Sequence, residues 1–195
     1  MRMNDFAKEV HQNAVEHGWW EEARSCGEII ALCHSELSEA LEEYRAKRPM
    51  VWAKDEDGTM IEDLCEIAAK KLKPEGIAVE LADCIIRILD WFGEERLSAD
   101  ELMMEAARFM YCDVPRRLFS ASLGDYIARW HLLLSLGFSC WCRATGTQIA
   151  AVRMALCINE INEWAAERQI DMDAILSVKH EYNKGRPYRH GGKAL

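Results

Sequence analysis

Two pairs of acidic residues stand three positions apart within apolar sequence, Glu36 with Glu39 and Glu80 with Asp83. Residues three apart project from the same face of a helix, so each pair presents two carboxylates side by side. If two such helices pack face to face, four acids meet, and burying that much like charge is costly unless a cation neutralises it. Magnesium prefers carboxylate oxygens and usually shares its coordination with substrate phosphates. The spacing therefore indicates a divalent metal site for phosphate ester or anhydride chemistry.

The alternative is that these acids form ordinary solvated helix faces, as most aspartates and glutamates do. Neither acidic pair alone distinguishes a metal site from a solvated helix face. The second pair favours a site, because it lies in the segment 77–92, which is apolar around most of its circumference and typical of a central helix in a bundle. Acids in such a helix need a partner.

The elements that would carry these residues are predicted from apolar periodicity, which is helical throughout, while strand signals are almost absent. A turn is predicted at 55–58 and a break between helices at 137–146. Ser98 and Asp171 are the expected starts of two helices. We expect an all-α helical bundle with helices at 4–17, 27–48, 60–72, 77–93, 98–111, 120–136, 146–168 and 172–183.

The composition is typical of a soluble globular protein, since half of the 195 residues are hydrophobic and 29% are charged. The net charge of −9 argues against general nucleic-acid binding. The N-terminus lacks the apolar core of a signal peptide, and the longest apolar stretch is shorter than the roughly 20 residues that span a bilayer. We therefore expect a cytoplasmic protein that binds a small molecule, with neither nucleic acid nor membrane as a partner.

The cysteine pattern argues against a structural zinc site or a disulfide framework. The chain has eight cysteines and no CxxC pair, and the closest spacing is that of Cys140 and Cys142. Several fall within helical patterns and are predicted to be small buried hydrophobes: Cys33, Cys65, Cys84 and Cys157.

The helix at 77–91 has an echo at 150–164. The packing residues Ala78, Val79, Ala82, Cys84, Ile85, Ile88 and Trp91 recur as Ala151, Val152, Ala155, Cys157, Ile158, Ile161 and Trp164. Glu80 and Asp83, however, become Arg153 and Leu156. A duplication would mean that the second copy has lost its metal ligands and kept its packing residues. The alternative is that two amphipathic helices of one bundle share composition by chance.

This echo suggests a division of the chain. We expect a metal-binding helical half over 1–111 and a degenerate second half with a basic tail over 112–195. The two halves would pack as separate units or as one domain.

The motifs resemble those of the MazG-like members of the all-α nucleoside triphosphate pyrophosphohydrolases. That family's hallmark is EExxE followed, one helix later, by ExxD. Here the first motif runs from Ser35 to Glu39 and the second from Glu80 to Asp83, with Ser35 where the family has its first glutamate. The surrounding phrases also fit, namely 34–45, 73–83, 179–183 and 186–193, so the resemblance covers the first half and the extreme C-terminus.

The resemblance implies the helical bundle of that family and a site in which Glu36, Glu39, Glu80 and Asp83 bind Mg²⁺, with Mn²⁺ as a substitute. Family members cleave a nucleoside triphosphate between the α and β phosphates, which gives the monophosphate and pyrophosphate. The metal withdraws charge from the α-phosphorus and orients the attacking water. A carboxylate left free of metal accepts the proton of that water, so the same four acids are the expected catalytic residues. A phosphoribosyl-ATP pyrophosphohydrolase or a dUTPase would differ only in substrate.

Complementary charge gathers at the end of the chain, where residues 179–195 include five Lys or Arg residues and one Glu. Lys179 and Asn183 share a helix face, and Arg186 follows just beyond; such donors suit phosphate oxygens. The alternative is a basic terminus without a specific role. We expect Lys179, Asn183 and Arg186 to bind the substrate.

Aromatic residues offer a platform for a base. Trp19 and Trp20 follow the first predicted helix and are predicted to stack on the base, although such tryptophans are more often core or interface residues. Trp52 is a weaker candidate of the same kind, and His34 is expected to be structural rather than a ligand.

Two further expectations concern assembly and catalysis. Small bundles usually need partners to cover their apolar faces, so we expect a homodimer or a higher homo-oligomer. The competing functional hypothesis is a non-catalytic helical oligomerisation module that binds a metal or a nucleotide without turnover.

Overall fold

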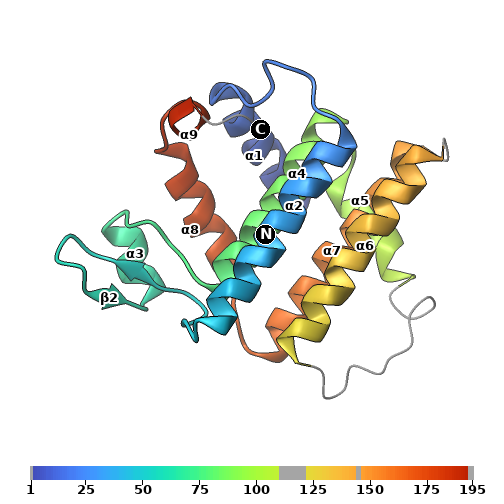
Figure 1. Ribbon diagram of the computed structural model, residues 1–195. Coiled ribbons are helices and arrows are strands. Elements are labelled where there is room, and N and C mark those ends of the chain that lie inside the picture. The colour runs from blue at the N-terminus through green and yellow to red at the C-terminus, as the bar shows by residue number, and fades with distance from the viewer. Residues whose placement is uncertain (1, 110–121, 144–145, 193–195) are drawn as a thin grey trace.

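The computed structural model describes residues 2–109, 122–143 and 146–192, and over these ranges the chain is mostly helical (Figure 1). The elements follow in the order α1 (Met3–Glu16), α2 (Cys26–Arg45), β1 (Ala53–Lys54), β2 (Met60–Ile61), α3 (Leu64–Ala69), α4 (Ile77–Glu94), α5 (Ala99–Ala107), α6 (Leu123–Cys142), α7 (Thr147–Glu167), α8 (Met172–Lys184) and α9 (Arg189–Gly192). The expected all-α class is confirmed, with one two-stranded sheet as an addition in the described ranges.

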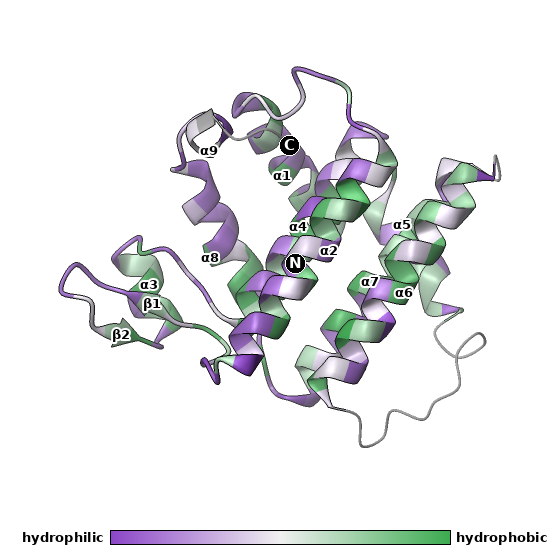
Figure 2. Ribbon diagram, viewed as in Figure 1, coloured by the Kyte–Doolittle hydropathy of each residue, from purple (hydrophilic) through white to green (hydrophobic). Residues whose placement is uncertain are grey.

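Helix α4 lies at the centre of the bundle and contacts α1, α2, α7 and α8. Its residues Ile85, Ile88 and Phe92 are fully buried, as the continuous apolar character of 77–92 predicts. Helices α6 and α7 pair on one side, where α5 covers α7 and α2 contacts α6. Figure 2 shows the contrast between the largely hydrophilic α8 and the hydrophobic faces of α6 and α7. Glu80 and Asp83 therefore lie on the central helix of the bundle.

The larger hydrophobic core includes residues from both sides of the expected boundary at 111. Phe6 and Trp91 contribute from the first half, and Trp130 and Trp164 from the second. The rings of Trp130 and Trp164 meet edge to face, with centroids 5.9 Å apart. The described parts of the two halves therefore pack around a shared interior.

Local hydrogen bonds fix where the helices begin. Ser98 and Asp171 are N-caps as predicted, since each side chain accepts a hydrogen bond from a backbone N–H three residues later. Ser25 and Glu28 form a reciprocal capping box at the start of α2. This box sets the position from which Glu36 projects.

Gly76 precedes α4 and lets the chain pass close to its first turn. Its φ is +114°, and a Cβ there would lie 2.7 Å from the carbonyl oxygen of Met50 and 2.8 Å from that of Pro49. The N–H of Ala78 donates to the same Met50 oxygen over 2.9 Å. The backbone after α2 is thereby tied to the turn of α4 that carries Glu80.

The predicted helix at 60–72 is wrong in its first part, because β2 pairs with β1 as an antiparallel hairpin across the predicted turn at 55–58. Asp63 then accepts a hydrogen bond from the N–H of Glu66 over 2.7 Å and starts the short α3. The apolar residues that produce the helical pattern are divided between hairpin and helix, and they form a small separate cluster: Ala53, Ile61 and Ile67.

The predicted break at 137–146 is wrong in its first part, because α6 continues through Gly137 to Cys142, and α7 begins at Thr147 where the predicted break ends. Gly137 is buried, and a Cβ there would lie 3.4 Å from the carbonyl oxygen of Ala150 on α7. The glycine serves close helix packing rather than termination. The predicted helix at 98–111 ends earlier, with α5 closing at Ala107, and its last two residues lie outside the described ranges.

Three of the four cysteines predicted as core residues, Cys33, Cys84 and Cys157, are fully buried, whereas Cys65 is exposed on α3 and that prediction is wrong. Over the described part of the chain, none of the helices combines the length and the apolar character that crossing a membrane requires.

Candidate functional site

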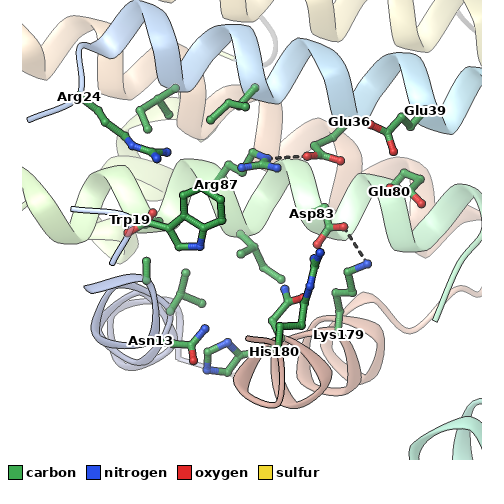
Figure 3. A pocket seen from close by; sticks show the side chains of 18 of the residues that line it. Asn13, Trp19, Arg24, Glu36, Glu39, Glu80, Asp83, Arg87, Lys179 and His180 are labelled. Atoms are coloured by element: carbon green, nitrogen blue, oxygen red, sulfur yellow. Dashed lines mark hydrogen bonds and ion pairs between the residues drawn. The ribbon is translucent and has the colours of Figure 1, made fainter. Parts of the chain in front are cut away.

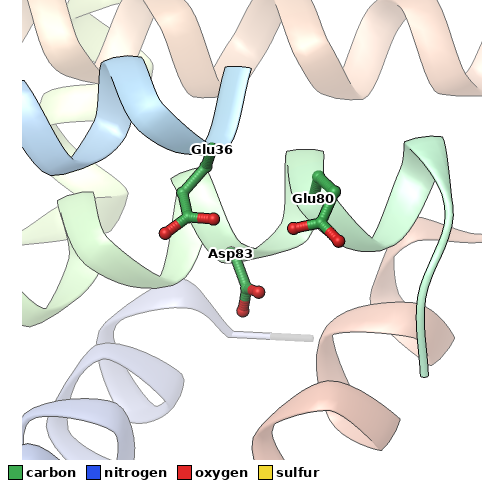
Figure 4. A group of neighbouring side chains, drawn as sticks. All are labelled: Glu36, Glu80 and Asp83. Carbon is green, nitrogen blue, oxygen red and sulfur yellow. The ribbon is translucent and has the colours of Figure 1, made fainter. Parts of the chain in front are cut away.

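Three of the four predicted carboxylates converge. Glu36 on α2 and Glu80 and Asp83 on α4 each offer an oxygen within 4.8 Å of the others (Figure 4). The ExxD spacing aims both α4 acids at the same side, and the packing of α2 on α4 brings Glu36 to them. Oxygen ligands gathered at this separation suit a hard divalent cation.

Glu36 is buried, with 5% of its surface exposed, and it is paired with Arg87, whose Nε lies 2.5 Å from Glu36 Oε1. Burial raises the pKa of Glu36, and the guanidinium of Arg87 works in the opposite direction. The charge of Glu36 in turn raises the pKa of Arg87 against the effect of burial. The negative charge of Glu36 is therefore balanced by Arg87.

Glu80 has the most perturbed carboxylate of the cluster. Burial, reinforced by the negative charge of Asp83, raises its pKa to about 8, although Lys179 acts to lower it. No ion pair joins Glu80 to any other residue in the described ranges. The cluster therefore carries negative charge that its own cations leave partly uncompensated.

Lys179 reaches the cluster from α8. Its Nζ lies 2.8 Å from Asp83 Oδ2, and only 4% of its surface is exposed. Burial lowers the pKa of Lys179, but Asp83, by charge and hydrogen bond, more than reverses this and leaves the pKa raised. The predicted phosphate ligand thus contacts a predicted metal ligand, so the first and last parts of the chain build one site.

Glu39, the fourth predicted acid, stays at the rim. It is exposed, and the hydroxyl of Ser35 donates to its Oε1 over 3.2 Å. Figure 3 shows Glu39 on the side of Glu36 that faces away from Arg87. Ser35 therefore supports a neighbouring acid on the same helix.

A cavity of about 240 Å³ opens beside the cluster, between α1, α2, α4 and α8 (Figure 3). Of the predicted substrate-binding residues, Lys179, Asn183, Arg186 and Trp19 line it. Arg24 joins Trp19 there, with its guanidinium carbon 5.0 Å from the centre of the indole ring. The cavity thus joins carboxylates, cations and an aromatic ring.

Trp20 does not line this cavity. It packs against the core, and its Nε1 donates to Asp90 Oδ1 over 2.8 Å. Trp52 is likewise buried, and its Nε1 donates to Glu43 Oε2 over 2.7 Å. His34 contacts His131 on α6, with 2.6 Å between their Nδ1 atoms, so it bridges two helices.

Sequence reasoning missed several residues that line the cavity, above all Arg87 and Asp90. They continue the face that begins with Glu80 and Asp83, at intervals of four and three residues along α4. With Glu94 at the end of α4, five charged residues follow at intervals of three or four in an otherwise apolar helix, and this pattern can be read from the sequence. His180 was missed as well; it is buried at the cavity wall, and its Nε2 has no hydrogen-bond partner among the described residues.

The second half of the chain has an ion pair similar to that of Glu36 and Arg87, with the acid and the base exchanged between the two helices. Arg129 on α6 forms a two-bond ion pair with Glu160 on α7. In the sequence echo Glu160 occupies the place of Arg87, so an ion pair between two helices is present in both halves with its charges exchanged. The duplication hypothesis thus gains support from an ion pair, which the shared apolar composition of the two helices does not explain.

Comparison of the chain with protein-family models, with curated proteins and with solved structures found no match, so the functional argument rests on the residues and their geometry.

Proposed function

We propose that the protein is a Mg²⁺-dependent hydrolase that converts a nucleoside triphosphate to the monophosphate and pyrophosphate. The observation that carries the proposal is the convergence of Glu36, Glu80 and Asp83, from two helices, on a cavity that also presents Lys179 and Arg186. This combination of hard oxygen ligands and phosphate-binding cations matches the resemblance to the MazG-like family.

The chemistry of the cluster fits the proposed ion. Burial raises the pKa of both Glu36 and Glu80, which means that their negative charge lacks sufficient compensation. A divalent cation supplies that compensation, and a set made only of carboxylates suits Mg²⁺ or Mn²⁺ better than metals that prefer sulfur or nitrogen. When bound, the ion would neutralise phosphate charge and activate water.

The other residues have distinct tasks in this proposal. Lys179 and Arg186 bind phosphate oxygens by charge-assisted hydrogen bonds, and Asn183 adds a neutral contact. Trp19 provides an aromatic surface for the nucleoside. Glu39, which lies outside the three-acid cluster, accepts the proton of the attacking water.

One observation favours the rival hypothesis of a non-catalytic module that binds a metal or a nucleotide. Arg87 and Lys179 already pair with two of the three clustered acids. A metal must therefore compete with Lys179 for Asp83, and a protein with these pairs intact would bind ligands without turnover.

The deciding experiment incubates the purified protein with a panel of ribo- and deoxyribonucleoside triphosphates and Mg²⁺ and measures pyrophosphate. We expect release from at least one nucleotide, with no release after Glu80→Gln or with EDTA. Glu42→Gln is the matched control and should leave the rate unchanged, because Glu42 is an exposed acid of α2 whose one ion pair with the described residues is with Arg45. Binding of nucleotide without any product would favour the rival hypothesis.

The expected homo-oligomer stays a prediction. Its support is a group of exposed apolar side chains along α6: Leu132, Leu136, Phe138 and Trp141. Light scattering at several protein concentrations tests it, and a strict monomer would instead favour a duplicated chain that covers its own faces.

A further inference from the structure

Asp90 is an acidic residue that lines the cavity, and the proposed metal binding and phosphate binding assign it no role. It stands seven residues after Asp83 on the same face of α4, and at 1.5 Å per residue this places it about 10 Å further along the helix axis. It lines the same cavity as the three clustered carboxylates and Trp19. If the phosphates lie at the carboxylate cluster, Asp90 stands where the nucleoside must lie.

The two oxygens of Asp90 have different surroundings. Oδ1 accepts a hydrogen bond from Trp20 Nε1 and one from His11 Nδ1, each over 2.8 Å. Oδ2 makes no hydrogen bond with any residue in the described ranges. One oxygen is thus anchored, and the other is an acceptor available to a ligand in the cavity.

The anchoring of Asp90 depends on a close approach of α1 to α4. A Cβ on Gly93 would lie 2.4 Å from the Cβ of His11, so the absence of a side chain lets His11 come near enough to reach Asp90. The carboxylate in turn raises the pKa of His11, mainly through their hydrogen bond. The imidazole of His11 and the indole N–H of Trp20 therefore hold a carboxyl group whose side chain is only 16% exposed, and burial raises the pKa of Asp90 against the effect of these two contacts.

A carboxylate can only accept hydrogen bonds, so its free oxygen distinguishes ligands by their donors. Cytosine, adenine and guanine carry an exocyclic amino group, and an aspartate reads cytosine in this way in protein–DNA complexes. At the position of the cytosine amino group, thymine and uracil carry the carbonyl oxygen O4, which repels a carboxylate, and the one base donor beside it is the ring N3–H. The aromatic ring of Trp19, which lines the same cavity, suits a base better than a sugar.

Building on the proposed function, we propose that Asp90 Oδ2 accepts a hydrogen bond from the exocyclic amino group of the nucleobase, so that the site selects amino-bearing bases over thymine and uracil. His11 and Trp20 are positioning residues, because they act on the ligand only through Asp90.

The test compares dCMP and dUMP, which differ at the position of the amino group, by calorimetry in the presence of Mg²⁺. The wild-type protein should bind dCMP about tenfold or more tightly than dUMP. In Asp90→Asn the amide oxygen retains His11 and Trp20 as donors and the amide N–H₂ faces the cavity, so the preference should disappear or reverse. Glu42→Gln is the control: it changes an exposed acid that does not line the cavity, so dCMP should stay preferred.

Several results would overturn the inference. Equal affinity of the wild-type protein for the two nucleotides would do so even if Asp90→Asn fails to fold. An unchanged preference for dCMP over dUMP in a folded Asp90→Asn variant would also reject base reading. In these cases pyrophosphate release from triphosphates would leave the proposed function standing, whereas a wild-type protein that binds no nucleotide removes both.

Discussion

Replacing Glu80 by Gln is expected to stabilise the metal-free protein at pH 8 and to change little at pH 5. Burial and the adjacent Asp83 raise the pKa of Glu80 to about 8, whereas a glutamate of the unfolded chain titrates near 4.3. Between these values the folded state holds a proton that the unfolded state has lost, so the free energy of unfolding falls as pH rises through that window.

The size of the effect follows from the same difference. At about 1.36 kcal/mol for each pKa unit, the ionised side chain costs the folded state up to about 5 kcal/mol. Solvent screening of this partly exposed group lowers the expected gain for Glu80→Gln to about 2–3 kcal/mol at pH 8. Glu39→Gln removes one charge from the exposed rim and should change stability by less than about 0.5 kcal/mol.

Urea unfolding in EDTA at pH 5, 6, 7 and 8 measures these differences for the wild type and both variants. Added Mg²⁺ should then stabilise the wild type more than Glu80→Gln, because the variant has lost a ligand. A wild-type-to-variant difference that is the same at pH 5 and pH 8 would refute the burial cost that we assign to Glu80.

Three further predictions concern contacts around the site and the core. Lys179→Met removes the cation beside Asp83 and should destabilise the metal-free protein by about 3 kcal/mol, with a larger gain in Tm from Mg²⁺ than the wild type shows; equal gains would contradict competition between lysine and metal. Arg129→Met should lower the free energy of unfolding by about 3 kcal/mol, while the double variant with Glu160→Leu should lie within about 1 kcal/mol of the wild type in urea titrations; an equally unstable double variant would count against the buried pair. Gly93→Ala puts a Cβ 2.4 Å from the nearest atom of α1 and should cost about 1–3 kcal/mol in thermal unfolding, so a neutral substitution would show that α1 moves freely.

The sequence predicts features that depend on local periodicity. Glu80 and Asp83 share a face because the helical repeat alone decides it, and Ser98 and Asp171 cap helices because their side chains bond to backbone three residues away. The central position of α4 follows in the same way, since apolar residues cover most of its circumference.

Features that depend on which helices meet are beyond the sequence alone. The charge of Arg87 is visible, but its pairing with Glu36 exists only because α2 crosses α4 at that level. In the sequence Gly137 indicates the end of a helix, but in the structure it allows α6 to pack closely against α7. Trp19 and Trp20 are neighbours in sequence, yet one lines the cavity and the other bonds to Asp90 in its wall.

The pairing of Lys179 with Asp83 also bears on how the protein is made. A chain emerging from the ribosome exposes the acids of α4 long before α8 has been synthesised, and for that interval they lack the lysine that helps to balance them. Nascent chains and products truncated before α8 should therefore be unable to complete the cavity, even with α2 and α4 in place. The cavity can therefore form only after α8 has been made, since α8 is the last in chain order of the four helices that line it.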